Sequence, residues 1–198
     1  GFRLGVTLLA AGVIAFYFWS LHCVSRLSLR EKQTDYYALQ VHGWRKGSLA
    51  MDVAPHPDLR VEYPNKIVRA APFLLDASYY QGKYYLYFGP APALVLLLPY
   101  NLITGWDIPE ALAAAVFASL GFLLALAWMF CLVRTFFPTA GAGVQWAGLL
   151  ALGLANLAPV ALVRPLFYEL AVSSSYAFTQ AMLLTATLAV IRPRQALG

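Results

Sequence analysis

The chain has 198 residues, of which 61% are hydrophobic and only 12% are charged, and its mean hydropathy is +0.64. Soluble globular domains carry about 25% charged residues, so this composition excludes an ordinary soluble fold and predicts an all-α polytopic membrane protein. The formal charge of +5 does not indicate nucleic-acid binding, because the surplus of basic residues falls at the ends of apolar segments.

Four apolar segments are long enough to cross a bilayer, which requires about 20 residues per helix. In chain order, these predicted spans cover residues 1–25, 111–134, 141–163 and 171–191. A short loop, 164–170, connects the last two spans. Residues 26–110 form a long loop between the first two spans, and they contain nearly equal numbers of basic and acidic side chains.

The long loop is predicted to contain a first surface helix over residues 35–46. Thr34 or Asp35 precedes it as a candidate N-cap, and Gly47 follows as a stop signal. Between them, apolar side chains recur at helical spacing, which is typical of a helix lying along a membrane surface.

The second half of the loop contains two further features. Residues 67–75 and 79–88 bracket Gln81-Gly82-Lys83, which fits either a short hairpin turn or a helix-loop junction. The many tyrosines of this region favour the lipid headgroup layer. Residues 90–105 are apolar but short and are interrupted by Pro92 and Pro99. They are predicted to form a re-entrant or interfacial helix that does not cross the membrane.

The distribution of arginines predicts the orientation of the chain in the membrane. If residues 90–105 do not cross, one side carries Arg3, Arg134, Arg192 and Arg194. The positive-inside rule then makes the N-terminus cytoplasmic and places loop 26–110 outside the cytoplasm. Cys23 and Cys131 fall near opposite faces in this topology and are not expected to pair.

Acidic residues near a membrane are costly, so they are the first candidates for a functional site. Asp35 is the candidate in the loop, with a helix cap as the alternative interpretation. Glu169 is the candidate between the last two spans, with an ion pair to Arg164 as the alternative. Lys83, Arg69 and Arg164 could hold a phosphate group as point charges or forks. His42 and His56 are interpreted as surface residues, because neither has a second metal ligand at useful spacing.

The order of these features resembles the N-terminal part of the GT-C type polyprenyl-phosphate-dependent membrane glycosyltransferases, which include the protein mannosyltransferases and the aminoarabinose transferases. The resemblance lies in Asp35-Tyr36-Tyr37 opening a surface helix after the first span, in the proline-led segment 90–105, and in Arg164-Pro165 followed by Glu169.

This resemblance implies transfer of a sugar from a lipid-phosphate donor to an acceptor on the extracytoplasmic face, in a bacterial inner membrane. Asp35 would be the catalytic base and Glu169 a second acid, while Lys83 or Arg164 would meet the donor phosphate. The implied partners are membrane lipid and the lipid-linked donor, and a divalent metal ion stays an open question. The chain looks like a fragment that is inactive alone. The alternatives are a non-catalytic membrane scaffold and a transporter subunit.

Overall fold

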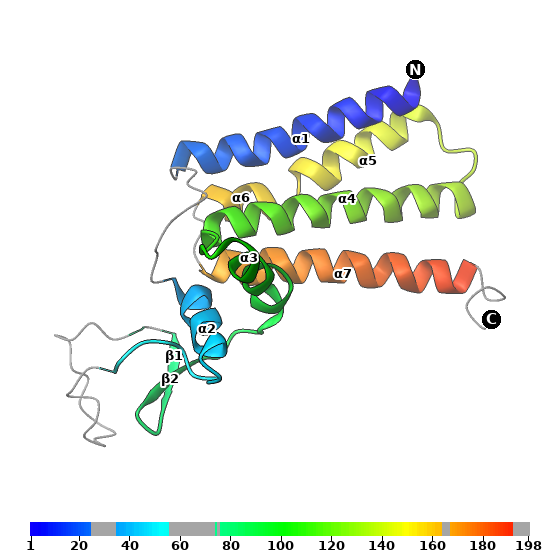
Figure 1. Ribbon diagram of the computed structural model, residues 1–198. Helices are drawn as coiled ribbons and strands as arrows, with labels where there is room; N and C mark the ends of the chain where they lie inside the picture. The colour runs from blue at the N-terminus through cyan, green and yellow to red at the C-terminus, as the bar shows by residue number, and fades with distance from the viewer. Residues whose placement is uncertain (25–34, 56–73, 75, 164–166, 192–198) are drawn as a thin grey trace. The chain divides into compact units, whose positions relative to one another are not determined.

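The computed structural model describes residues 1–24, 35–55, 74, 76–163 and 167–191, and the chain divides into two compact units (Figure 1). The first unit combines Gly1–Ser28 with Glu110–Gly198, and the second unit is Leu29–Pro109. The described residues are mostly helical, with one two-stranded hairpin in the second unit. The prediction of a helical protein is confirmed.

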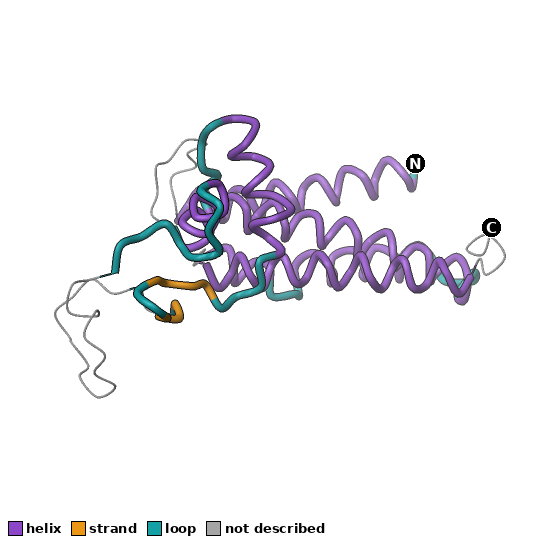
Figure 2. The backbone as a smooth tube through the Cα atoms, turned by 60° about the horizontal axis from the view of Figure 1, so that its bottom comes forward, coloured by secondary structure: helices purple, strands orange, loops and turns teal. Residues whose placement is uncertain are grey.

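The first unit is a bundle of apolar helices that run alternately in opposite directions. Its helices are α1 (Phe2–Val24), α4 (Glu110–Phe136), α5 (Ala142–Leu154), α6 (Ala158–Val163) and α7 (Phe167–Ile191). The start of α1 and the end of α7 lie at the same end of this bundle (Figures 1 and 2). With α5 and α6 taken as one segment, the described residues contain four helices that are long and apolar enough to cross a membrane.

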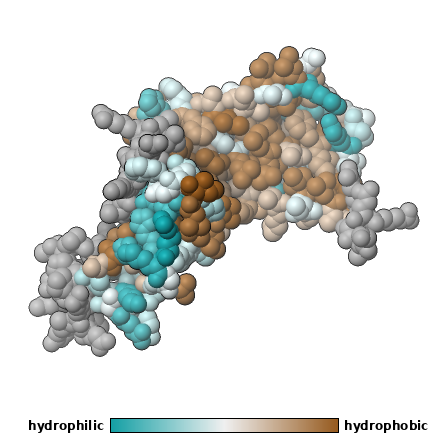
Figure 3. Space-filling model, in the orientation of Figure 1, coloured by the Kyte–Doolittle hydropathy of each residue, from teal (hydrophilic) through white to brown (hydrophobic). Residues whose placement is uncertain are grey.

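On the face that Figure 3 shows, most of the surface of this bundle is hydrophobic. Large apolar side chains that point outward include Leu8 and Trp19 of α1 and Met182 and Val190 of α7. Water would not support so much exposed apolar surface, whereas lipid tails would. The helix lengths and this surface identify the chain as an integral membrane protein, as the composition predicts.

The third span is interrupted between α5 and α6. Pro159 has no N–H to donate to the carbonyl of Ala155, and its ring would crowd that carbonyl in a continuous helix. Asn156 bonds to both sides of the break: its Nδ2 donates to the Leu152 carbonyl at 2.5 Å, and its Oδ1 accepts from the Ala158 N–H at 2.8 Å. Asn156 therefore gives a partner to one carbonyl and one N–H at the break, as the interior of a membrane requires of backbone groups.

Small residues allow the helices of the bundle to approach one another closely. A Cβ added to Gly121 of α4 would collide with the ring of Tyr176 on α7, along a pair of helices that lie side by side (Figure 2). A Cβ added to Gly153 of α5 would lie 2.8 Å from Val13 on α1 and 3.1 Å from Phe122 on α4. Close approach of this kind gives membrane helices the van der Waals contact that stabilises them in lipid.

The second unit combines one packed helix, a hairpin and a proline-containing helical segment. These are α2 (Tyr36–Arg45), β1 (Ala77–Tyr80), β2 (Lys83–Leu86), η2 (Ala93–Leu97) and α3 (Leu98–Thr104). Tyr80 pairs with Lys83, and the turn residues Gln81 and Gly82 both have positive φ, as in the twisted turns that hairpins favour. The hairpin alternative is correct for this turn. The predicted segment 67–75 lies almost entirely outside the described residues.

Helix α2 is packed into the second unit on most of its surface. Tyr37 and Val41 are fully buried. The main chain that follows α2 bonds to the hairpin, where Met51 N–H donates to the Tyr84 carbonyl at 2.9 Å. It also bonds back to α2, where Asp52 N–H donates to the Leu39 carbonyl at 2.9 Å. A Cβ at Gly43 would collide with the Ala50 carbonyl. These contacts hold α2 as a rigid element.

The predicted re-entrant or interfacial segment is the helix formed by η2 and α3. Pro99 removes a donor that a regular α-helix needs, and the wider turn of η2 directly precedes it. One side of the segment, with Ala93, Leu97 and Asn101, is buried, whereas Ile103 on the other side is 84% exposed. The segment Ala93–Thr104 is apolar but too short to be a candidate span.

Candidate functional site

Asp35 stands at the N-terminal boundary of α2. Its backbone is extended, with φ −68° and ψ 149°, and its carbonyl accepts the Leu39 N–H at 2.9 Å. Its side chain is half-buried and makes no capping hydrogen bond to the helix. The cap interpretation therefore holds for the backbone of Asp35 and not for its carboxylate.

Two to three turns after Asp35, α2 carries a polar network that joins it to α3. His42 Nε2 lies 2.9 Å from Asp107 Oδ1, and Asn101 Nδ2 donates to the same oxygen at 2.8 Å. Arg45 Nη1 donates to Asn101 Oδ1 at 2.7 Å. Asn101 is only 3% exposed, so its amide connects two charged side chains in a largely water-free position.

The chemistry of this network indicates which ring nitrogen of His42 donates. An ionised carboxylate can only accept, so Nε2 of His42 carries the hydrogen that it shares with Asp107. His42 is half-buried, and its ring bonds to a side chain that is 65 residues away in the sequence. The network attaches the last two turns of α2 to the segment that contains α3.

Of the three basic residues proposed to hold a phosphate, the structure describes Lys83. It is exposed at the start of β2, next to the turn of the hairpin. Arg69 and Arg164 lie outside the described residues, as does His56. Beside Lys83, burial raises the pKa of the Tyr84 phenol, and the neighbouring Tyr79 adds to this effect.

Glu169 lies in the first turn of α7 and is half-buried. A negative charge is favoured there, because the first turn of a helix exposes unpaired N–H groups and the positive end of the dipole. The ion pair predicted with Arg164 involves a residue outside the described part of the chain. Glu169 belongs to the first unit and Asp35 to the second, and their convergence at one site stays a prediction.

Another polar cluster lies inside the span bundle, next to the break between α5 and α6. Tyr17 donates its hydroxyl hydrogen to the Gly153 carbonyl at 2.5 Å and accepts from Asn156 Nδ2 at 3.4 Å. The adjoining cavity, bordered by Ser173 and Tyr176, has a volume of about 70 Å³, which is room for a few water molecules. The cluster gives hydrogen-bond partners to polar groups near the break in the third span, and the bond from Tyr17 to the Gly153 carbonyl joins α1 to α5.

Among the described residues, no group of three or more His, Cys, Asp and Glu side chains is placed to hold a metal ion. Cys23 and Cys131 are free thiols. A role for a divalent metal ion therefore stays an open question. Comparison with known proteins finds no matching family model, no matching curated protein and no matching solved structure.

Proposed function

We propose that this chain is part of a membrane glycosyltransferase that moves a sugar from a lipid-phosphate donor to an acceptor on the extracytoplasmic face. In this proposal the N-terminus is cytoplasmic, and the second unit lies outside the cytoplasm of a bacterial cell, at the inner membrane. Asp35 acts as the catalytic base, and Glu169 is a second acid of the site. Lys83, together with Arg164 or Arg69, meets the phosphate of the donor.

The observation that carries this proposal is the placement of Asp35 on a rigid element. Catalytic groups must be held within a fraction of an ångström of their working position, which favours side chains on packed helices over side chains on loops. Helix α2 meets this need through its buried residues Tyr37 and Val41 and through the bond between His42 and Asp107. A half-buried acid at its first turn is thus suited to proton abstraction.

A lipid-linked donor also suits the composition of the second unit. Its exposed residues combine a cation, Lys83, with aromatic and aliphatic side chains such as Tyr80 and Leu102. Aromatic side chains favour the headgroup layer, where the phosphate of a polyprenyl carrier lies. Basic side chains in the same layer can pair with that phosphate.

The test is the replacement Asp35→Asn in membranes that contain the full-length protein. Asparagine is a good residue at the start of a helix, so α2 should keep its structure. Loss of a general base typically lowers the rate by 10²- to 10⁴-fold. The measurement is the release of polyprenyl phosphate from a polyprenyl-phosphate sugar donor.

A matched control is Asp52→Asn, which removes another acid from the same unit. Asp52 pairs with Lys46 at 2.7 Å on the surface, so its loss should cost less than about 1 kcal/mol of stability and leave transfer unchanged. Normal donor cleavage in the Asp35→Asn variant would refute the catalytic role. A wild-type protein that binds an envelope partner but never cleaves the donor would instead support the scaffold alternative.

A further inference from the structure

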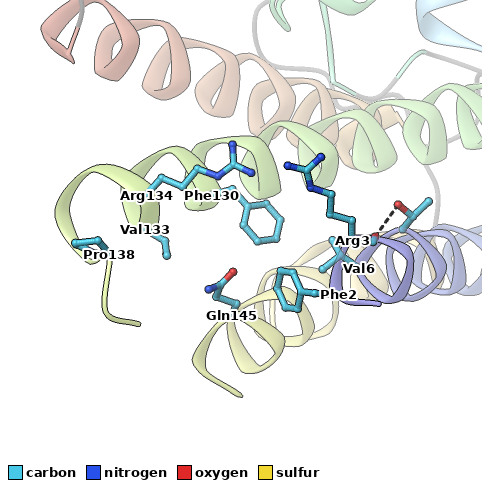
Figure 4. A pocket seen from close by; sticks show the side chains of 9 residues that line it. Phe2, Arg3, Val6, Phe130, Val133, Arg134, Pro138 and Gln145 are labelled. Atoms are coloured by element: carbon cyan, nitrogen blue, oxygen red, sulfur yellow. Dashed lines mark hydrogen bonds between the residues drawn. The ribbon is translucent and has the colours of Figure 1, made fainter. Parts of the chain in front are cut away.

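A cavity of about 380 Å³ opens in the first unit, where α1 begins and α4 ends. Its walls come from α1, from α4, from the connection to α5 and from α5 itself (Figure 4). The lining residues are Phe2, Arg3, Val6, Thr7, Phe130, Val133, Arg134, Pro138 and Gln145. Neither the proposed transfer reaction nor the packing of the bundle accounts for this cavity.

Two arginines dominate the charge of the cavity. The guanidinium groups of Arg3 and Arg134 point toward one another across it (Figure 4). No carboxylate is among the lining residues, and neither arginine forms an ion pair within the described part of the chain. Glu110, at the opposite end of α4, is about 36 Å away along the helix at 1.5 Å per residue.

The position of Arg3 also favours an anion in the cavity. Arg134 lies in the last turn of α4, where a cation is favoured by the helix dipole. Arg3 lies in the first turn of α1, where the same dipole disfavours it. Two like charges facing one another, one of them at an unfavourable helix end, are stabilised if a negative group lies between them.

The rest of the lining is apolar and indicates what carries the negative group. Phe2, Val6, Phe130 and Val133 form hydrocarbon walls, and the ring of Phe2 meets that of Trp146 at a centroid distance of 5.4 Å. The cavity therefore combines two cationic side chains with apolar walls at the end of a membrane-spanning bundle. This is the chemistry of a phospholipid, whose phosphate is anionic and whose acyl chains are apolar.

We propose that this cavity binds the phosphate group of an anionic membrane phospholipid. Arg3 and Arg134 hold the phosphate oxygens as forks, and Phe2 and Phe130 contact the glycerol and the upper acyl chains. Glu169 lies at the start of α7, which is the opposite end of the bundle, so this lipid site is distinct from the site proposed for sugar transfer.

The test is native mass spectrometry of the delipidated protein titrated with phosphatidylglycerol or with phosphatidylcholine of the same acyl chains. The wild-type protein should bind phosphatidylglycerol more tightly. The double variant Arg3→Gln/Arg134→Gln loses two charge-assisted hydrogen bonds, so its Kd for this lipid should rise at least about tenfold. The variant Val133→Trp, which fills the cavity and keeps both charges, should lose binding as well, and it serves if the double variant fails to fold.

A matched control removes two lysines of the second unit, which do not line the cavity. Lys46→Gln/Lys83→Gln has the same net charge as the cavity variant and should keep the affinity for phosphatidylglycerol. Equal loss in both double variants would overturn the proposal, because only diffuse attraction would then remain. Competition with inorganic phosphate distinguishes a phospholipid from free phosphate as the anion that the cavity binds. Failure to displace the lipid supports a phospholipid site, whereas full displacement at millimolar concentration overturns the lipid in favour of free phosphate.

Discussion

Replacing Asn101 by alanine should loosen the attachment of α2 to the rest of the second unit. The amide of Asn101 accepts from Arg45 at 2.7 Å and donates to Asp107 at 2.8 Å. Asp107 in turn holds His42 of α2 at 2.9 Å. Alanine removes both hydrogen bonds and leaves a small void, so the helix keeps its apolar contacts and loses its polar anchor.

The magnitude follows from the exposure of the two partners. Asp107 has a side chain that is only 12% exposed, so its bond is worth about 1.5–3 kcal/mol, as is typical of hydrogen bonds to charged groups. Arg45 is exposed, and water recovers most of its bond, which leaves roughly 0.5–1 kcal/mol. The expected loss is about 3 kcal/mol, or about a hundredfold in the opening equilibrium.

Hydrogen exchange of the α2 amides, followed by mass spectrometry in lipid nanodiscs, measures this equilibrium. The α2 amides of the Asn101→Ala variant should exchange about a hundred times faster than those of the wild type. Leu49→Ala, a truncation at a side chain that is 78% exposed, should change the rate little.

An exchange of the two partners tests the network itself. In the double variant Asn101→Asp/Asp107→Asn, the new carboxylate accepts from Arg45 and from the new amide, whose oxygen accepts from His42. Protection of the α2 amides from hydrogen exchange should return toward the wild-type value. Asn101→Asp alone places two carboxylates side by side, so its α2 amides should exchange fast. Unchanged exchange in Asn101→Ala, or no recovery in the double variant, would refute the anchoring role.

Two further predictions concern the bundle and the membrane surface. Gly121→Leu forces a side chain into the ring of Tyr176 on α7 and should destabilise the bundle by about 1–3 kcal/mol, whereas Gly12→Leu enters open space and should not. Thermal unfolding in detergent compares the two variants. Equal unfolding midpoints would contradict the close packing of α4 against α7. The exposed apolar side of α3 should lie in lipid, because only five residues separate α3 from the span α4. With both native cysteines replaced, a nitroxide at Ile103→Cys should then be reached by oxygen and not by a water-soluble nickel complex, and one at Lys46→Cys should show the reverse. Equal access of the nickel complex to both sites would contradict an interfacial position.

Features that depend on neighbours in the chain were predictable from the sequence. The four spans follow from the length of the apolar segments, since lipid imposes the same requirement on each segment separately. The end of α2 follows from Gly47, whose φ of +75° suits glycine, and the turn of the hairpin follows from Gln81-Gly82. The sequence also contains Pro159, but its effect on the third span depends on the bonds that Asn156 makes at the break.

Features that depend on distant residues were decided by the tertiary structure. His42 lies on α2 and Asp107 directly before α4, and nothing in either local sequence indicates that they bond. Likewise, Arg3 and Arg134 each resemble an ordinary charge at the end of a span, and only the packing of α1 against α4 makes them face one cavity. Hydropathy and turn chemistry act over a few residues, whereas a hydrogen-bond partner or a shared cavity exists only once distant segments have been brought together.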